Sequence, residues 1–341
     1  MPRFLHHDVA NIFKGKSILV TGGTGSFGKQ FVGTVLERYD VRKLIIFSRD
    51  EQKHFEMGQQ FSDREFPAVR YFIGDIRDRD RLELAMRDVD LVVHAAALKH
   101  VPIAEYNPTE CIHTNVLGAE NIVRAALRCG VKSVVALSTD KAVNPVNLYG
   151  ASKLCADKIF VAANNLSGGD GPRFSVVRYG NVVGSRGSVI PFFQSMVEKG
   201  ADSLPITDER MTRFWVTLQQ GVDFVLSTFY LMDGGEIFVP KLPSMRVVEL
   251  ARSLAPDLPQ RVIGIRAGEK LHEILITSED SRNTVEMLDR YIVLPHYAFW
   301  TAKDISTVTT PVPEGFQYTS DTNAQWLDGD GLRDMIAETV A

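Results

Sequence analysis

The sequence predicts an α/β fold in which a doubly wound, mostly parallel sheet lies between two layers of helices. Three observations predict it. Short β-branched runs recur along the first 180 residues, longer helical stretches separate them, and a glycine-rich turn follows the first run. Strand–helix alternation of this kind is typical of parallel sheets with right-handed crossovers. A smaller lobe, interleaved with the first, is expected from the residues beyond.

Most of the expected strands are apolar throughout rather than alternating, as in strands that are buried on both faces. The six runs are Ser17–Thr21, Lys43–Phe47, Val69–Ile73, Asp90–His94, Ser133–Ser138 and Phe174–Arg178. Helical patterns fill the gaps at Lys29–Arg38, Arg79–Arg87, Asn115–Cys129 and Ala151–Asn165. Residues 1–180 should therefore form mainly the sheet domain and residues 181–341 mainly the second lobe, with some segments returning to the first. An irregular segment is expected from residue 311 onward.

Composition excludes several classes of protein. The 341 residues are 45% hydrophobic and 23% charged, which is ordinary for a globular chain and unlike a disordered one or a coiled coil. A net charge of −4 gives no electrostatic footprint for nucleic acid or an anionic membrane. The three cysteines lack CxxC spacing, so we predict no disulfide framework and no metal site. No apolar run approaches the roughly 18 residues of a spanning helix, and we expect a cytoplasmic protein.

A glycine-rich turn, TGGTGSFG at Thr21–Gly28, joins the first strand to a helix. Glycines let the backbone approach a pyrophosphate closely, and the helix that follows points free amides and its positive dipole end at the anion. This context predicts dinucleotide binding on a Rossmann-type sheet, with a purely structural turn as the alternative. The predicted contacts are Gly22, Thr24, Gly25, Ser26, Phe27 and Gly28.

The end of the second strand indicates which dinucleotide binds. An NAD site usually places a carboxylate there, whereas Ser48 and Arg49 suit a 2′-phosphate and Lys53 lies one turn on. NADP is therefore favoured, although Asp50 keeps NAD open. Asp75 and Ile76 are placed to meet the adenine, unless Asp75 instead caps a helix. The predicted cofactor set also includes Glu51, Ala95, Ala96 and Lys99, and Lys99 could equally meet the substrate.

Tyr149 and Lys153 follow the fifth strand at positions i and i+4, so they share one face of a helix. A lysine ammonium beside a phenol favours the phenolate, which lowers the tyrosine pKa. Such a tyrosine can take a proton from a sugar hydroxyl while hydride leaves the same carbon for nicotinamide. The position also matches the edge at which open α/β sheets bind ligands.

The glycine turn and the YxxxK helix resemble those of the extended short-chain dehydrogenase/reductases. Longer strings resemble the inverting UDP-N-acetylglucosamine 4,6-dehydratases of the pseudaminic-acid pathway, and the resemblance spans nearly the whole chain. The strings lie at His94–Pro108, Ser138–Lys153, Val176–Phe193, Ile206–Trp215, Gly234–Lys241 and Gly268–Glu273.

The resemblance implies a reaction with no net redox change. C4 of the sugar is oxidised by bound NADP, water is eliminated across C5–C6, and hydride returns to C6 with inversion at C5. Asp140 is then expected to protonate the leaving hydroxyl, and Lys141 to remove the C5 proton if it is neutral. Burial or neighbouring cations would be needed to keep that lysine neutral. Thr139 would hold the C4 oxygen, while Tyr149, paired with Lys153, would act first and later return a proton to C5.

The resemblance also implies a substrate set and an assembly. Asn181, Thr212, Arg213, Arg266 and Glu269 match family positions for UDP-N-acetylglucosamine, and arginine suits its diphosphate. The helices at Asn115–Cys129 and Ala151–Asn165 would pair two subunits as a four-helix bundle in a homo-oligomer, a dimer or a hexamer. Two alternatives stay open: a retaining dehydratase or 4-epimerase of the same scaffold, and a catalytically dead NADP-binding regulatory protein. The complete set from Thr139 to Lys153 argues against the second.

Overall fold

The computed structural model describes residues 4, 9–185, 187–297 and 308–340, so much of the N-terminal segment lies outside it. Its centre is a ten-stranded sheet in the order β16-β14-β15-β10-β6-β5-β4-β1-β2-β3. The neighbouring strands β3, β2, β1, β4, β5, β6 and β10 run parallel to one another. Beyond β10, each of the strands β15, β14 and β16 runs antiparallel to the strand before it. The first six strands are β1 (Ser17–Thr21), β2 (Lys43–Ser48), β3 (Val69–Ile73), β4 (Leu91–His94), β5 (Ser133–Thr139) and β6 (Arg173–Tyr179).

Those six strands confirm the predicted ones to within one residue at each end, and their order is that of a classic Rossmann sheet. Every residue of β1 is buried, as its unbroken apolar run predicts for a strand covered on both faces. The remaining sheet strands come from the second half of the chain: β10 (Ile237–Pro240), β14 (Thr284–Glu286), β15 (Arg290–Val293) and β16 (Thr310–Pro311). The domain division at residue 180 stays a prediction.

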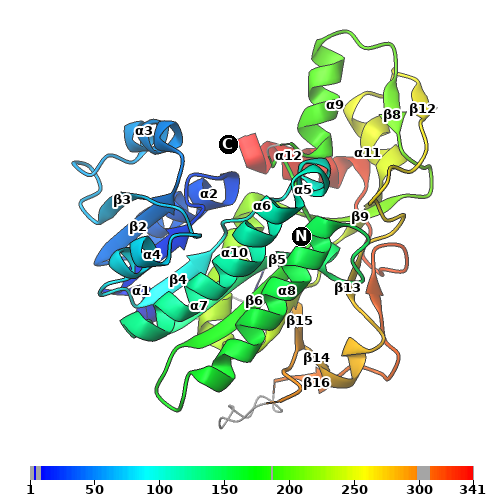
Figure 1. Ribbon diagram of the computed structural model, residues 1–341. Coiled ribbons are helices and arrows are strands. Elements are labelled where there is room, and N and C mark those ends of the chain that lie inside the picture. Colours follow the sequence, from blue (N-terminus) through cyan, green and yellow to red (C-terminus); the bar gives the residue numbers. More distant parts are fainter. Residues whose placement is uncertain (1–3, 5–8, 186, 298–307, 341) are drawn as a thin grey trace.

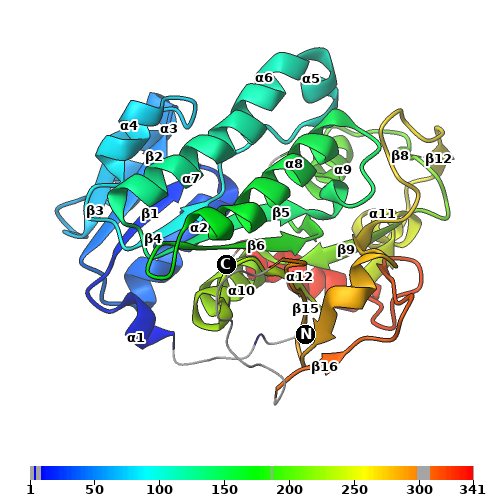
Figure 2. The same cartoon turned by 60° about the horizontal axis from the view of Figure 1, so that its bottom comes forward.

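Helices cover both faces of the sheet. Figure 2 shows α7 (Gly118–Cys129) and α8 (Leu148–Ala163) on one side and α10 (Leu218–Leu231) on the other. The helix α2 (Ser26–Arg38) lies beside α10, to which Arg38 is joined by a 3.0 Å ion pair with Asp223. The short helices are α1 (Ala10–Phe13), α3 (Glu51–Gln60), α4 (Arg79–Ala85), α5 (Val101–Tyr106) and α6 (Pro108–Ile112).

The predicted helix at Asn115–Cys129 begins differently from the expectation. A π-helical turn, η1 (His113–Leu117), joins α6 to α7. Within it the buried Asn115 accepts a hydrogen bond from the backbone of Leu98, donates one to the Leu98 carbonyl and donates another to Ser152. π-Helical turns are frequent at functional sites. This one fixes the loop after β4 against α8.

A second hydrophobic cluster forms the smaller lobe, at the upper right of Figure 1. Its elements are α9 (Val189–Glu198), α11 (Val247–Leu254), β8 (Leu204–Ile206) and β12 (Gln260–Val262). A small sheet of β7 (Asn181–Val182), β9 (Thr212–Val216) and β11 (Ser244–Arg246) lies beside the cluster, and β13 (Ile274–Ile276) pairs with β17 (Tyr318–Thr319).

The expectation of an irregular segment from residue 311 onward was wrong for its last part, because residues 329–340 form the helix α12 (Gly329–Val340). Leu332 and Met335 lie one turn apart and are fully buried in the second cluster. Asp328 accepts a hydrogen bond from the backbone of Gly331 in the first turn. Because the buried face of this helix has few apolar residues, the helical spacing of apolar residues is hard to recognise in the sequence. Among the described residues, no helix combines the length and apolarity needed to cross a membrane.

Candidate active site

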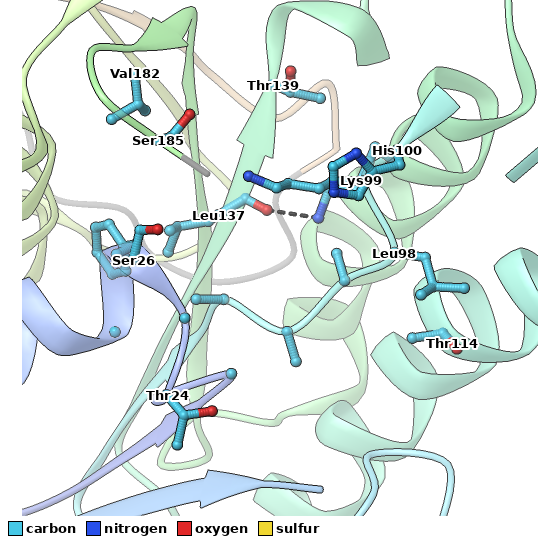
Figure 3. A pocket seen from close by; sticks show the side chains of 18 of the residues that line it. Thr24, Ser26, Leu98, Lys99, His100, Thr114, Leu137, Thr139, Val182 and Ser185 are labelled. Atoms are coloured by element: carbon cyan, nitrogen blue, oxygen red, sulfur yellow. Dashed lines mark hydrogen bonds between the residues drawn. The ribbon is translucent and has the colours of Figure 1, made fainter. Parts of the chain in front are cut away.

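A cavity of about 580 Å³ opens at the carboxyl ends of the parallel strands. This edge is where open α/β sheets bind ligands, and the volume falls within the usual range of small-molecule sites. Figure 3 shows Thr24 and Ser26 at one end, with Thr139 and Lys99 at the other. The cavity thus connects the glycine turn to the end of β5.

The structure brings most of the predicted site residues to this cavity. Those that line it are Gly22, Thr24, Gly25, Ser26, Phe27, Gly28, Ser48, Arg49, Lys53, Asp75, Ile76, Ala95, Ala96, Lys99, Thr139, Lys141, Tyr149, Lys153 and Asn181. Seven predicted residues do not line it: Asp50, Glu51, Asp140, Thr212, Arg213, Arg266 and Glu269.

The glycine turn has the shape of a phosphate cradle. Gly22 has φ +65°, and a side chain there would meet the backbone of Ala96 at 2.9 Å. A side chain at Gly28 would collide with the backbone of Gly23, where α2 crosses the turn. Gly25 precedes α2 as its N-cap and no side chain caps that helix, so its first amides are open to an anion. These features fit a dinucleotide pyrophosphate.

At the end of β2 the residues have separate roles. The hydroxyls of Ser48 and Thr24 are 2.8 Å apart, and the Arg49 guanidinium lies 3.7 Å from the Asp75 carboxylate. Asp50 accepts a hydrogen bond from the Lys53 backbone as the N-cap of α3 and forms a 2.7 Å ion pair with the Lys53 ammonium. Asp50, the carboxylate that left NAD binding possible, is therefore already bonded to the first turn of α3.

The alternative role predicted for Asp75, as a helix N-cap, was wrong. Asp78 caps α4 by accepting a hydrogen bond from the Arg81 backbone. Asp75 instead accepts hydrogen bonds from the backbone and guanidinium of Arg77. It lies four residues before the first residue of α4 and lines the cavity.

Tyr149 lies in the first turn of α8, where Asn147 caps the helix by accepting from the Gly150 backbone. The Lys153 ammonium donates a 2.6 Å hydrogen bond to the carbonyl of Leu137, the bond dashed in Figure 3. Burial raises the pKa of Tyr149 to about 12, and Lys141 only partly offsets it. The predicted lowering of this pKa by Lys153 was therefore wrong, because burial dominates and the opposing cation is Lys141. Burial also lowers the pKa of Lys153.

The turn after β5 carries a compact group of charges, which we call the charge cluster: Asp140, Lys141 and Glu273. The Lys141 ammonium lies 3.0 Å from Oδ1 of Asp140 and 3.4 Å from Oε1 of Glu273. The Lys141 side chain is 28% exposed, whereas those of Asp140 and Glu273 are 0% and 2% exposed. Only the lysine of this cluster therefore faces the cavity. Thr139, which also lines the cavity, donates a 2.8 Å hydrogen bond to Oδ1 of Asp140.

The cluster sets the protonation of its members in opposite directions. Burial and the charge of Glu273 raise the pKa of Asp140. Burial alone would raise the pKa of Glu273, but the charges of Lys141, Arg213 and Lys270 outweigh it and lower that pKa. Two carboxyl groups with pKa values pushed apart are typical of an acid and a base at one site. The first carboxyl follows β5, and the second precedes β13.

The sequence left the protonation of Lys141 open, and the surroundings of this lysine favour its charged form. Burial and Arg213 would lower its pKa, but Asp140 and Glu273 outweigh them and raise it. Glu273, the last residue of the GEKLHE string, was not among the residues predicted for the site. That string also fixes the catalytic turn: Lys270 donates to the carbonyls of Asp140 and Val143, and Asn147 donates to the Gly268 carbonyl at 2.7 Å.

The predicted substrate residues are placed in two groups. Asn181 lines the cavity, and the oxygen of its side-chain amide, Oδ1, is buried without a hydrogen bond from any described residue. Thr212 and Arg213 lie buried in β9, where the Arg213 guanidinium donates to the carbonyls of Thr212, Lys270 and Leu271. Arg266 and Glu269 face each other at 3.9 Å on a loop outside the cavity. Within the described ranges, no His, Cys, Asp and Glu side chains gather to hold a metal ion.

Comparison with known proteins shows which family has this sequence and fold. Residues 18–295 match the family described as "Polysaccharide biosynthesis protein". Over 96% of this chain and 99% of the relative, the sequence is 56% identical to a UDP-N-acetylglucosamine 4,6-dehydratase (inverting) of Campylobacter jejuni (strain 81-176). A UDP-glucose 4-epimerase of Rickettsia bellii (strain OSU 85-389) is 43% identical over 83% of this chain and 84% of its own.

Solved structures show the same fold. Pen from Bacillus thuringiensis is 35% identical with a TM-score of 0.87, covering 96% of this chain and 99% of its own. DesIV, a dTDP-glucose 4,6-dehydratase from Streptomyces venezuelae solved with NAD and TYD bound, is 25% identical with a TM-score of 0.66. That match covers 75% of this chain and 86% of DesIV. With its glycine turn, its YxxxK helix and these relatives, the chain belongs to the polysaccharide biosynthesis protein family of extended short-chain dehydrogenase/reductases.

Proposed function

We propose that this chain is an inverting UDP-N-acetylglucosamine 4,6-dehydratase, a hydro-lyase that uses bound NADP and forms a UDP-linked 4-keto-6-deoxy sugar of L-arabino configuration. The observation that carries the proposal is the charge cluster, in which Lys141 faces the cavity between Asp140 and Glu273, near Tyr149. Such a cluster supplies both an acid and a base beyond the tyrosine, as an elimination requires. The relative of 56% identity carries the name of this activity.

The glycine turn and the uncapped start of α2 support a nicotinamide dinucleotide, as does the NAD bound in DesIV. Three observations support NADP: Ser48, Arg49 and Lys53 line the cavity, the Arg49 side chain is exposed there with only a 3.7 Å ion pair to Asp75, and Asp50 is engaged as a helix cap. When bound, the nicotinamide supplies the hydride acceptor for C4 and the hydride donor for C6.

The residues at the inner end of the cavity divide the proton transfers among them. Tyr149 takes the proton of the C4 hydroxyl, and Thr139 holds the C4 oxygen. Because burial raises the pKa of Tyr149 to about 12, a nearby cation must stabilise its anion, and Lys153, one turn further along α8, is proposed to supply it. Lys99 and Asn181 line the same cavity and are proposed to hold the sugar nucleotide.

Elimination then uses the charge cluster. The raised pKa of Asp140 favours its acid form, which gives a proton to the departing C6 hydroxyl. Lys141 removes the C5 hydrogen as a proton, which the neighbouring C4 ketone makes acidic. Tyr149 returns a proton to C5 from the opposite face, and this accounts for inversion. We further propose that Thr212, Arg213, Arg266 and Glu269 serve the uridine half, directly or by shaping its loop.

The remaining features of the assembly are proposals of the same kind. Residues 1–180 would mainly hold NADP and residues 181–341 mainly the UDP-sugar, in a cytoplasmic enzyme that opens pseudaminic acid biosynthesis. A homo-oligomer through α7 and α8 is supported by large apolar side chains exposed beside these helices, at Tyr106, Ile112 and Leu117.

A UDP-sugar 4-epimerase is the second candidate, favoured by the 43% identity to the Rickettsia relative. Epimerisation at C4 moves one proton at O4 and one hydride, so Tyr149 would suffice and the charge cluster would have no role. Incubation with UDP-N-acetylglucosamine in deuterated water, followed by NMR, separates the candidates. We expect a 4-keto-6-deoxy product of L-arabino form with deuterium at C5. Simple C4 inversion, a product that keeps the D configuration, or unchanged substrate with intact NADP binding would overturn the proposal.

A further inference from the structure

Glu273 reaches the catalytic turn from a distant part of the chain and is held there firmly. Its backbone accepts a 2.9 Å hydrogen bond from the Ser320 amide and donates one of 2.9 Å to the Ser320 hydroxyl. It lies directly before β13, which pairs with β17. Its side chain is 2% exposed and points at the lysine of the turn, 3.4 Å from the ammonium. The carboxylate is therefore a fixed neighbour of Lys141.

The two oxygens of this carboxylate differ. Oε1 lies near Lys141 and 3.5 Å from Nε of Arg213, whereas Oε2 has the Lys270 ammonium at 3.9 Å. Oε2 accepts no hydrogen bond from any described residue, although it is buried. A buried carboxylate oxygen without a hydrogen bond is costly. That cost falls when the carboxyl group takes up a proton.

The proposed reaction requires such an acceptor. Lys141 lies between two carboxyl groups that favour its charged form, and it must lose a proton before its amine can act on C5. Asp140 is the other carboxyl within reach, but its task is to bring a proton of its own to the C6 hydroxyl. An acceptor that is distinct from Asp140 and adjacent to Lys141 is needed, and Glu273 is the group in that position.

We propose that Glu273 is a positioning residue that holds Lys141 and takes up the proton that Lys141 releases when the sugar covers it. This inference rests on the proposed dehydratase function. An N–H bond of the ammonium breaks and an O–H bond forms on the carboxylate, so a charged pair becomes a neutral pair. No other reactant is needed, and the free amine then accepts the C5 proton. Glu273 itself does not touch the substrate.

Substrate binding supplies the driving force. Lys141 is the member of the charge cluster that faces the cavity, so a bound sugar removes water from the lysine while the two carboxyls are already buried. Loss of water disfavours charged forms, and it therefore favours the neutral pair. Among the described residues, the other ionisable groups whose charges act on the pair are Asp140 on the turn, Tyr149 on α8, Arg213 on β9 and Lys270 on the segment before β13.

The test is the pH dependence of proton exchange at C5 in Glu273→Gln. The exchange rate is measured by NMR in deuterated water and divided by the rate of C4 oxidation, which is followed through the absorbance of the reduced cofactor. In the wild type this ratio should not fall as the pH is lowered from 9 to 6. In the variant Lys141 must lose its proton to solvent, so the ratio should fall about tenfold per pH unit below the lysine pKa. Glu273→Asp keeps an acceptor and should restore the flat profile.

Asp289→Asn is the matched control, because Asp289 is a buried carboxylate paired with the buried Arg290 at 2.8 Å, remote from the cavity. It should lower the melting temperature and leave the pH profile flat. Full turnover in Glu273→Gln, or a loss of equal size at every pH, would overturn the inference. A wild type that makes no 4-keto-6-deoxy sugar would instead overturn the proposed function.

If Glu273→Gln does not fold, a second measurement on a different variant tests the same inference. Asp140→Asn leaves Glu273 as the one carboxyl beside Lys141. An infrared difference spectrum of this variant, with and without UDP-N-acetylglucosamine, should show a new protonated-carboxyl band on substrate binding. Absence of that band would count against the inference.

Discussion

The two ends of the cavity are built in different ways. The cofactor end comes chiefly from two segments near the start of the chain, the glycine turn, which offers backbone amides, and the end of β2. The reaction end joins the turn after β5 to a glutamate more than a hundred residues later, through buried charges. Anion binding by backbone amides is little affected by most side-chain substitutions. The protonation of a buried charge cluster, in contrast, changes when any one of its charged residues is replaced.

The largest expected effect lies at the reaction end. Lys141→Ala should lower dehydratase turnover about a thousandfold, because it removes the proposed C5 base. NADP affinity should not change, since the glycine turn makes the phosphate contacts. Turnover assays and a cofactor titration measure the two quantities. Lys199→Ala, at an exposed lysine after α9, is the control and should behave as the wild type. A parallel loss of NADP affinity would show that the two ends are not independent.

Asp140→Asn should lower turnover about a hundredfold, because the C6 hydroxyl then departs without a proton donor. Exchange at C5 should persist, since Lys141 and Glu273 remain. The pH profile gives a second readout. The pKa of Asp140 is raised, so its acid form and the turnover that needs it are present below that pKa and are lost as pH rises through it. The variant should lack this alkaline decline, and a profile that keeps it would assign the decline to another group.

Arg49→Ala tests the cofactor end, and its effect should be smaller. The side chain is exposed, so losing its contact with a 2′-phosphate should weaken NADP binding about tenfold while NAD binding stays unchanged. Fluorescence titrations with both dinucleotides measure the preference. Asp50→Ala provides the comparison: it removes the side-chain cap of α3, so it should lower the melting temperature slightly and leave the preference unaltered. Equal losses for NADP and NAD would remove the proposed role of Arg49.

The smallest effect is expected outside the cavity, at Arg266. This exposed arginine faces Glu269 at 3.9 Å, and contacts of this kind contribute about 1 kcal/mol or less. Arg266→Ala should therefore raise KM for UDP-N-acetylglucosamine roughly fivefold or less and leave kcat unchanged. A fall in kcat would show that this loop reaches the reacting sugar, which would make it part of the reaction end.

The contrast between the two ends also explains what the sequence could predict. Apolar runs such as Ser17–Thr21 indicate buried parallel strands directly, and the spacing of Gly22, Gly25 and Gly28 indicates the phosphate turn, because both signals are local. The helix α12 was missed because Leu332 and Met335 mark its buried face with too few apolar residues.

The charge cluster shows where such prediction stops. Asp140, Lys141 and Tyr149 could be found because they lie within ten residues of one another. Glu273 could not be placed beside them, because its position depends on the pairing of β13 with β17. The pKa of Tyr149 was mispredicted because burial dominates it, and the protonation of Lys141 could not be predicted because the distant Glu273 contributes to it.

The bonds of the GEKLHE segment to the catalytic turn have a consequence for protein engineering and for evolution. Asn147 binds the Gly268 carbonyl, and Lys270 binds the carbonyls of Asp140 and Val143, so the two segments form one unit in space. A chimera that receives residues 138–153 alone would inherit the lysine without the glutamate that faces it. Catalytic specificity in this scaffold should therefore be transferred only when residues 268–273 are exchanged together with residues 138–153. Natural recombination between relatives should be constrained in the same way.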